Sequence, residues 1–210
     1  MDALECIATR RSIRKFQDIP LEFEKLGNIL DAARFAPSAG NLQDVKIILV
    51  TDEQARQDIG SACVEQYWVG TAQVILVVCT DPDKTKRFYG EKGVLYSAHN
   101  AGTAVQNILL AAHDQGVSSC WVGAFEEEKL RRIVGVPGNA AIHAVIPLGY
   151  ADEKVPMPVR LTLENVVFLG SWGNRIKDIA AYMEWYGEHV QKAIKKGKQL
   201  VSDFARRLQG

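Results

Sequence analysis

The chain has 210 residues, which suits one domain with a modest extension. Hydrophobic residues make up 47% and charged residues 24%, so disordered, collagen-like and coiled-coil architectures are excluded as the main fold. The 25 Lys plus Arg residues balance 25 Asp plus Glu residues, and this neutral total argues against a protein that coats nucleic acid or an anionic membrane.

The first half of the chain alternates helical and extended patterns. The predicted elements are helices at residues 2–9, 21–35 and 52–69, a strand at 45–50, and a continuous apolar strand at 74–79. The apolar strand is β-branched on both faces, which indicates a central, doubly covered position in a sheet. Residues 81–93 are polar and are predicted as a loop, interpreted as a solvated connector rather than as a substrate lid.

The second half continues this pattern and then changes in texture. The predicted elements are helices at residues 96–115 and 126–134, and strands at 119–122, 141–148 and 166–168. From residue 174 onward the chain reads as an amphipathic helical tail, with eight Lys plus Arg residues against four Asp plus Glu residues. We therefore divide the chain into a core at 1–173 and a C-terminal extension at 174–210.

The cysteines and the N-terminus indicate the compartment. Four cysteines form no CxxC pair and have no histidine at zinc-site spacing, so no metal site is expected. No signal peptide is visible at the N-terminus, and the apolar runs are too short to span a bilayer. We expect a cytoplasmic protein with reduced thiols and no membrane or nucleic-acid partner.

Four short segments could carry chemistry. The basic run Arg10–Phe16 offers guanidinium groups and a serine hydroxyl for a phosphate, although alone it favours a solvated basic surface. The turn 36–43 offers the amides of Asn41 and Gln43 for a heterocycle edge, or is an ordinary loop. Gly123 and its neighbours expose backbone that a planar ligand could approach, or end a core strand. Arg160 is held in an extended proline-rich segment, or is a surface residue.

These segments together resemble the FMN-dependent nitroreductase family over about residues 3–172. The matching motifs, in chain order, are RRSIRKF, APSAGNLQ, QNILLAA leading to CWVGAF, IPLGY, and a final Arg before LENVVF. The resemblance implies an α+β fold, namely an α/β/α three-layer sandwich around a mostly antiparallel sheet. It also implies an intertwined homodimer with FMN at the subunit interface, in which residues 164–168 cross to the partner's sheet as a strand.

The cofactor-binding residues follow from the resemblance, motif by motif. Those matching the residues that hold the phosphate and the pyrimidine side of the flavin are Arg10, Arg11, Ser12 and Arg14, with Arg160 as a late basic residue that reaches the phosphate. Those matching the loop that the other subunit contributes are Pro37, Ser38, Ala39, Asn41 and Gln43. Those matching the backbone that faces the reactive nitrogen are Val122, Gly123 and Ala124.

The chain also departs from the family pattern, mainly on the substrate side. Pro158 stands where a second basic residue is common, and Gln73 stands where a proline often precedes the central strand. Ser97, His99 and Asn100 occupy a stretch where many members have an acidic residue.

The resemblance implies an NAD(P)H-dependent FMN oxidoreductase that reduces nitroaromatics, quinones or similar acceptors with ping-pong kinetics. FMN would carry the chemistry, so no catalytic side chain is predicted. The alternatives are another flavin reaction on the same fold, such as reductive dehalogenation, flavin fragmentation or azoline oxidation, or a non-catalytic FMN-binding protein.

Overall fold

The computed structural model describes residues 1–178, 180–189, 192 and 195. The chain forms two compact units, Met1–Met157 and Pro158–Gly210. The division made from the sequence, a core at 1–173 and a C-terminal extension at 174–210, stays a prediction.

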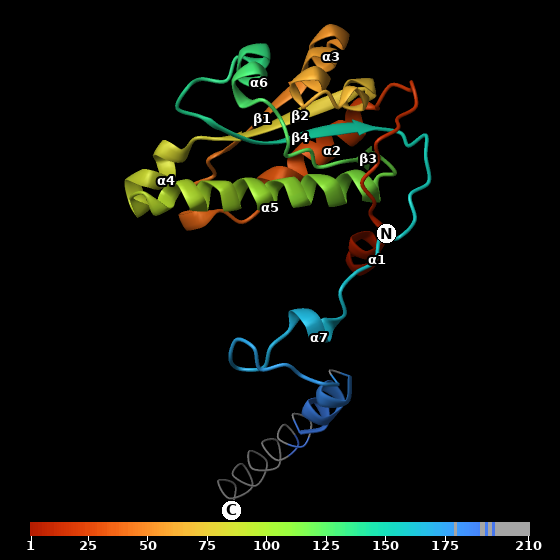
Figure 1. Ribbon diagram of the computed structural model, residues 1–210, viewed down its shortest axis with the longest axis vertical. Coiled ribbons are helices and arrows are strands. Elements are labelled where there is room, and N and C mark those ends of the chain that lie inside the picture. Colours follow the sequence, from red (N-terminus) through yellow and green to blue (C-terminus); the bar gives the residue numbers. More distant parts are fainter. Residues whose placement is uncertain (179, 190–191, 193–194, 196–210) are drawn as a thin grey trace, which may run out of the picture. The chain divides into compact units, whose positions relative to one another are not determined.

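The first unit is built on a four-stranded sheet in the order β1-β2-β4-β3, and all neighbouring strands are antiparallel. The strands are β1 (Val45–Val50), β2 (Val74–Thr80), β3 (Ser118–Ser119) and β4 (Ala141–Gly149). All seven residues of β2 are buried, which confirms the predicted central strand. Figure 1 shows the sheet between helices on both of its faces.

One face of the sheet is covered by α2 (Phe23–Arg34) and the long α5 (Lys92–Asp114). Ile29 of α2 and Ile108 of α5 are fully buried against alternate residues of β2 and β4, among them Leu76 and Ile146. This alternation follows from the two-residue period of a strand, which sends every second side chain to the same face.

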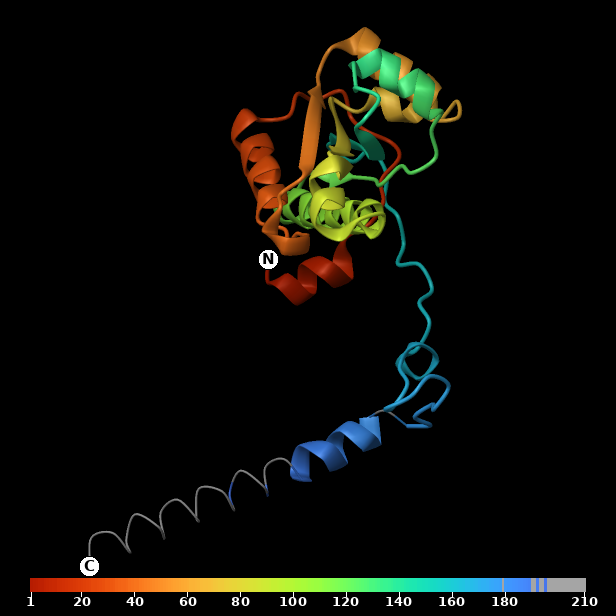
Figure 2. The same ribbon diagram turned by 90° about the vertical axis from the view of Figure 1, so that its left-hand side faces the viewer.

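The opposite face is covered by α3 (Glu53–Ala62), η2 (Tyr67–Thr71) and α6 (Glu127–Val134). Ile59 of α3 and Leu130 of α6 pack with Ile75, Val77 and Val145, the other parity of the central strands. Asp52 begins α3 by accepting the Ala55 N–H at 2.8 Å, as an N-cap does. The predicted α/β/α sandwich is confirmed, with the two cores separated by the sheet (Figure 2).

Four local predictions were wrong. Residues 81–93 are not a loop: Pro82–Tyr89 form α4, with Pro82 in its first turn, and α5 begins at Lys92. The helix predicted at 52–69 ends at Ala62, and only Ser118–Ser119 of the next region form β3. The strand predicted at 166–168 is not formed: Val166 is the last residue of a helical turn, α7 (Leu163–Val166), in the second unit, and Val167 caps it.

The second unit also contains a helix over residues 180–189, within the predicted amphipathic tail. Phe168 pairs with Arg175 in an isolated antiparallel bridge, and the Phe168 ring contacts the Trp172 ring at a centroid distance of 5.0 Å. Most of the predicted tail beyond residue 189 lies outside the described residues. In the described part of the chain, no helix is long and apolar enough to cross a membrane.

Candidate functional site: a cationic segment and a strained loop

The basic segment follows α1 (Ala3–Thr9) and runs extended beside the edge of the sheet. Ser12 forms a parallel bridge with Ser119, and Phe16 forms an antiparallel bridge with Ala151. The Ile13 N–H donates to the Ser119 carbonyl at 3.1 Å, which fixes the register. Side chains at positions 10, 12 and 14 therefore share one parity of an extended segment.

Arg10, Ser12 and Arg14 all act on the thiol of Cys120. Burial raises the pKa of that thiol, Arg14, a hydrogen bond with Ser12, and Arg10 partly offset the rise, and Glu153 adds to it. The Arg14 guanidinium also lies 5.9 Å from the centre of the Trp68 ring, a cation–π contact. The role of Arg10, Ser12 and Arg14 in holding a phosphate stays a prediction.

One nitrogen of the Arg10 guanidinium is an unsatisfied hydrogen-bond donor. Within the described residues, its Nη1 is buried and has no hydrogen-bond partner. A buried donor without a partner is costly, so an acceptor that reached it would be favoured. Arg11 differs, because its Nη1 donates to the carbonyls of Ala8 at 2.9 Å and Arg10 at 2.8 Å.

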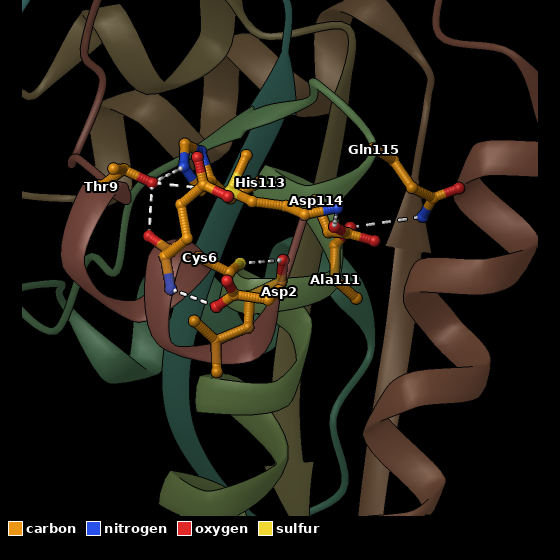
Figure 3. A network of polar contacts seen from close by, with 10 residues as sticks. Asp2, Cys6, Thr9, Ala111, His113, Asp114 and Gln115 are labelled. Atoms are coloured by element: carbon orange, nitrogen blue, oxygen red, sulfur yellow. Dashed lines mark hydrogen bonds and ion pairs between the residues drawn. The ribbon is translucent and has the colours of Figure 1, made fainter.

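The end of α1 is held on α5, which places the arginines. Thr9 Oγ1 donates to the Glu5 carbonyl and lies 2.9 Å from Nε2 of His113, while Cys6 Sγ donates to the Leu110 carbonyl (Figure 3). Burial, then Arg10 and Arg11, lower the pKa of His113. A pocket of about 140 Å³ lies here, and its lining includes Thr9, Arg10, Arg11, His113 and Ser119.

The predicted loop Pro37–Gln43 crosses the other half of α5. The Ala39 N–H donates to Oδ1 of Asn100 at 2.8 Å, and Thr103 Oγ1 donates to the Pro37 carbonyl at 3.0 Å. A pocket of about 210 Å³ lies beneath the loop, bordered by Pro37, Ser38, Gln43 and Asn100. Asn41 and Gln43 are exposed, and Nε2 of Gln43 donates to Oδ1 of Asn41 at 3.3 Å, so the two amides stand side by side at the surface.

The backbone at residues 122–124 passes from a buried bridge to an exposed segment. Val122 is buried and exchanges two backbone hydrogen bonds of 2.9 Å with Val145. Gly123 and Ala124 that follow are exposed. A Cβ added to Gly123 would meet only Nε1 of Trp121, at 3.8 Å, so a flat group has room to approach its backbone.

Within one chain, the arginine segment and the loop Pro37–Gln43 lie far apart. The arginine segment is tied to α5 at His113 and the loop at Asn100, thirteen residues earlier. At 1.5 Å per residue this separation is about 20 Å along the helix. Arg160 is exposed and belongs to the second unit, so its contribution stays a prediction.

Several residues of the site were missed by the sequence analysis. Trp68 and His113 contact or border the arginines, and Asp44 with Asn100 supports the loop. Only Asn100 gave a signal, as a departure from the family pattern. Among the described residues, no group of three or more His, Cys, Asp or Glu side chains could hold a metal ion.

Comparisons with known proteins bear on this arrangement. The sequence profile of the nitroreductase family matches residues 7–71 and 61–150. An NADPH-flavin oxidoreductase of Vibrio harveyi is 30% identical over 192 residues, covering 86% of this chain and 79% of the relative.

Solved structures agree in fold. An NADPH:FMN oxidoreductase from Vibrio harveyi complexed with NAD+ superposes with a TM-score of 0.74 at 27% identity, over 90% of this chain and 84% of that one. An FMN-dependent nitroreductase from Clostridium difficile superposes with a TM-score of 0.70 at 25% identity, over 80% and 99%. With the profile covering most of the first unit, the chain belongs to the nitroreductase family.

Proposed function

We propose that this protein is an FMN-dependent oxidoreductase that oxidises NADH or NADPH and reduces a nitroaromatic, quinone or similar acceptor. Relatives named NADPH-flavin oxidoreductase and FMN reductase [NAD(P)H] support this proposal. The observation that carries it is the buried, unpartnered Nη1 of Arg10 beside Ser12 and Arg14. A dianionic phosphate would satisfy that donor and offset the charge of two guanidinium groups.

The residues present fit both the phosphate and the flavin ring of FMN. Arg10, Ser12 and Arg14 would hold the phosphate, with Arg11 adding charge and Arg160 a late contact. The exposed backbone of Gly123 and Ala124 would lie along the reactive edge of the flavin. When bound, FMN would supply the redox chemistry, a two-electron exchange between the reduced nicotinamide and the acceptor.

The protein itself would bind and orient the flavin and its substrates and shield them from water. No side chain at the site is assigned a proton-transfer role, because hydride transfer through a cofactor requires the two planar partners to stack in order. Trp121 is 42% exposed beside Gly123 and offers an apolar wall for such a stack. Its indole would keep the entering ring flat against the backbone.

We propose a homodimer, because one chain cannot close the site. An isologous dimer in which α5 packs near its copy would bring the loop of one chain to the arginine segment of the other, across the separation of about 20 Å. The first unit exposes apolar side chains on α1 and at the start of α5 that such an interface would cover. They are Leu4 (78% exposed), Ile7 (56%), Val94 (43%) and Leu95 (56%).

One experiment tests the cofactor and the donor together. The absorbance spectrum of the purified protein is recorded before and after addition of FMN, and the flavin is then titrated with NADH and NADPH without oxygen. We expect a bound flavin that a nicotinamide bleaches and that a quinone or nitroaromatic restores. A protein that takes up no FMN would refute the proposal. A flavin that neither nicotinamide reduces would favour a non-catalytic FMN-binding protein.

The proposal has two further parts, the homodimer and the cytoplasmic location. Light scattering of the loaded protein is expected to give the mass of two chains. The cytoplasmic location stays a prediction from the sequence.

A further inference from the structure

The loop Pro37–Gln43 has a backbone that needs support. Gly40, Asn41 and Gln43 have φ angles of 56°, 54° and 50°. Only glycine adopts this left-handed region without steric cost, so Asn41 and Gln43 are strained. Strained residues persist only where the surroundings hold them, and such positions concentrate at binding sites.

A buried relay of side chains holds this loop. The carboxyl of Asp44 is fully buried and accepts from Ser97 Oγ at 2.5 Å and from Asn100 Nδ2 at 2.7 Å. Asn100 is 4% exposed, and its Oδ1 accepts the Ala39 N–H at 2.8 Å. The relay thus links α5 to the first residue of η1 (Ala39–Asn41) and to the residue that follows the loop.

The carboxyl of Asp44 determines the orientation of the Asn100 side-chain amide. A side-chain amide has one end that donates and one that accepts, and the two ends exchange by a flip. The carboxyl of Asp44 receives both the Ser97 hydroxyl and the Asn100 amide hydrogen. This directs the Asn100 oxygen to the Ala39 N–H. A neutral apolar residue at position 44 would leave the amide without a preferred orientation.

Neighbouring groups add to the support. The Asp44 carbonyl accepts the Asp81 N–H at 3.0 Å, just before α4. Tyr89, at the end of α4, packs on the loop so closely that a Cβ on Gly40 would lie 2.7 Å from its hydroxyl oxygen. A residue larger than glycine at position 40 would therefore push the loop away from α4.

We infer that Asp44 and Asn100 are positioning residues, which hold the loop in the shape that presents Ser38, Asn41 and Gln43 to a flavin bound by the partner subunit. The inference rests on the proposed function for its ligand. The relay contacts no part of the arginine segment, because Asn100 lies about 20 Å from His113 along α5. Its loss should act on the flavin ring and spare the phosphate.

Hydrogen exchange of the full chain without FMN tests the relay itself. We expect N100A to speed the exchange of amides in residues 37–43 about tenfold, because Ala39 loses its acceptor and Asp44 loses a donor. The matched control is N107A, which removes another α5 asparagine that donates to a different helix, at the Ala32 carbonyl, 3.1 Å away. N107A should leave the loop unchanged. Equal loop exchange in N100A and the wild type would overturn the inference.

Flavin affinity tests the role toward the ligand. N100A should weaken FMN and riboflavin by a similar factor of about ten, because riboflavin shares the ring and lacks the phosphate. A loss for FMN alone would overturn the inference. A wild-type protein that binds neither flavin refutes the proposed function instead, and the exchange experiment then still decides whether the relay holds the loop.

A second variant covers the case in which N100A does not fold. D44N keeps the size of the side chain and one acceptor oxygen, so the relay is weakened rather than removed. Its loop should exchange faster than that of the wild type, and its affinity for both flavins should fall. Unchanged exchange in D44N would count against the relay in the same way.

Discussion

Replacing Arg10 with methionine separates the binding of a phosphate from the stability of the fold. Within the described residues, Nη1 of Arg10 is buried without a hydrogen-bond partner. This lowers the stability of the unliganded protein by about 1–3 kcal/mol. Methionine keeps the aliphatic stem and removes that donor. The unliganded R10M protein should therefore be at least as stable as the wild type, which is unusual for a change at a half-buried position.

The same variant should lose phosphate recognition. A hydrogen bond to a charged group contributes about 1.5–3 kcal/mol, so FMN should bind about 10- to 150-fold more weakly. Riboflavin, which has no phosphate, should bind R10M and the wild type equally. R11M should have a smaller effect, because Nη1 of Arg11 is already bonded to two backbone carbonyls. R132M, at an exposed position of α6, controls for lost charge and should change neither affinity.

Fluorescence titration and thermal unfolding give both quantities. FMN at 100 times the wild-type Kd stabilises that protein by about 2.7 kcal/mol. R10M with a Kd raised 100-fold would gain about 0.4 kcal/mol at the same concentration, so most of the rise in Tm would disappear. The reasoning fails if R10M binds FMN like the wild type, or if it loses affinity for riboflavin by the same factor.

Other predictions concern buried titratable groups. Burial raises the pKa of Cys63 to about 12 and of Cys79 to about 11, so a thiol reagent at pH 8 should label neither until urea unfolds the chain; rapid labelling of the native protein would contradict this. Burial lowers the pKa of His143, so the unfolded state takes up a proton first as pH falls below about 6.5; stability measured by urea should fall from pH 7 to 5, and less steeply in H143Q. Phosphate bound beside Arg10 should raise the pKa of His113, which NMR titration with and without FMN would detect; an unchanged value would place the anion elsewhere.

The sheet and its helices were predictable because apolar patterning and burial agree. The run Val74–Thr80 has no polar face, and the structure buries all of it between two helical layers. Helix α4 was missed because most of its side chains are polar or charged and only Thr85 is buried, so the segment lacks the apolar stripe that marks a helix. At 166–168 the apolar, mostly β-branched composition predicted a strand, but Val166 ends a helical turn and Val167 caps it.

The site was predictable where its residues are close in sequence, and only there. Arg10, Ser12 and Arg14 share a parity that an extended segment brings to one side, and bridges at Ser12 and Phe16 hold this segment at the sheet, although the role of the three residues stays a prediction. Asp44 and its partners Ser97 and Asn100 are separated by more than fifty residues. No local pattern reports such a contact, since each residue alone is unremarkable in composition. Ser97 and Asn100 drew attention only as departures from the family, and a buried carboxyl on β1's N-terminal side accounts for both.

Backbone strain alone would not have located the loop. Val64 and Glu65, in the turn after α3, also have positive φ angles, of 57° and 56°. That turn carries an exposed valine and is held mainly by a local bond, from the Gln66 amide to the Cys63 carbonyl at 2.8 Å, with a longer contact of 3.5 Å from the same amide to the Ala124 carbonyl. The loop before β1 differs because its support is buried, comes from a distant helix and orders groups that remain exposed. Local support only closes a turn, whereas remote support of exposed amides fixes where those amides stand relative to the rest of the unit, which a binding surface requires.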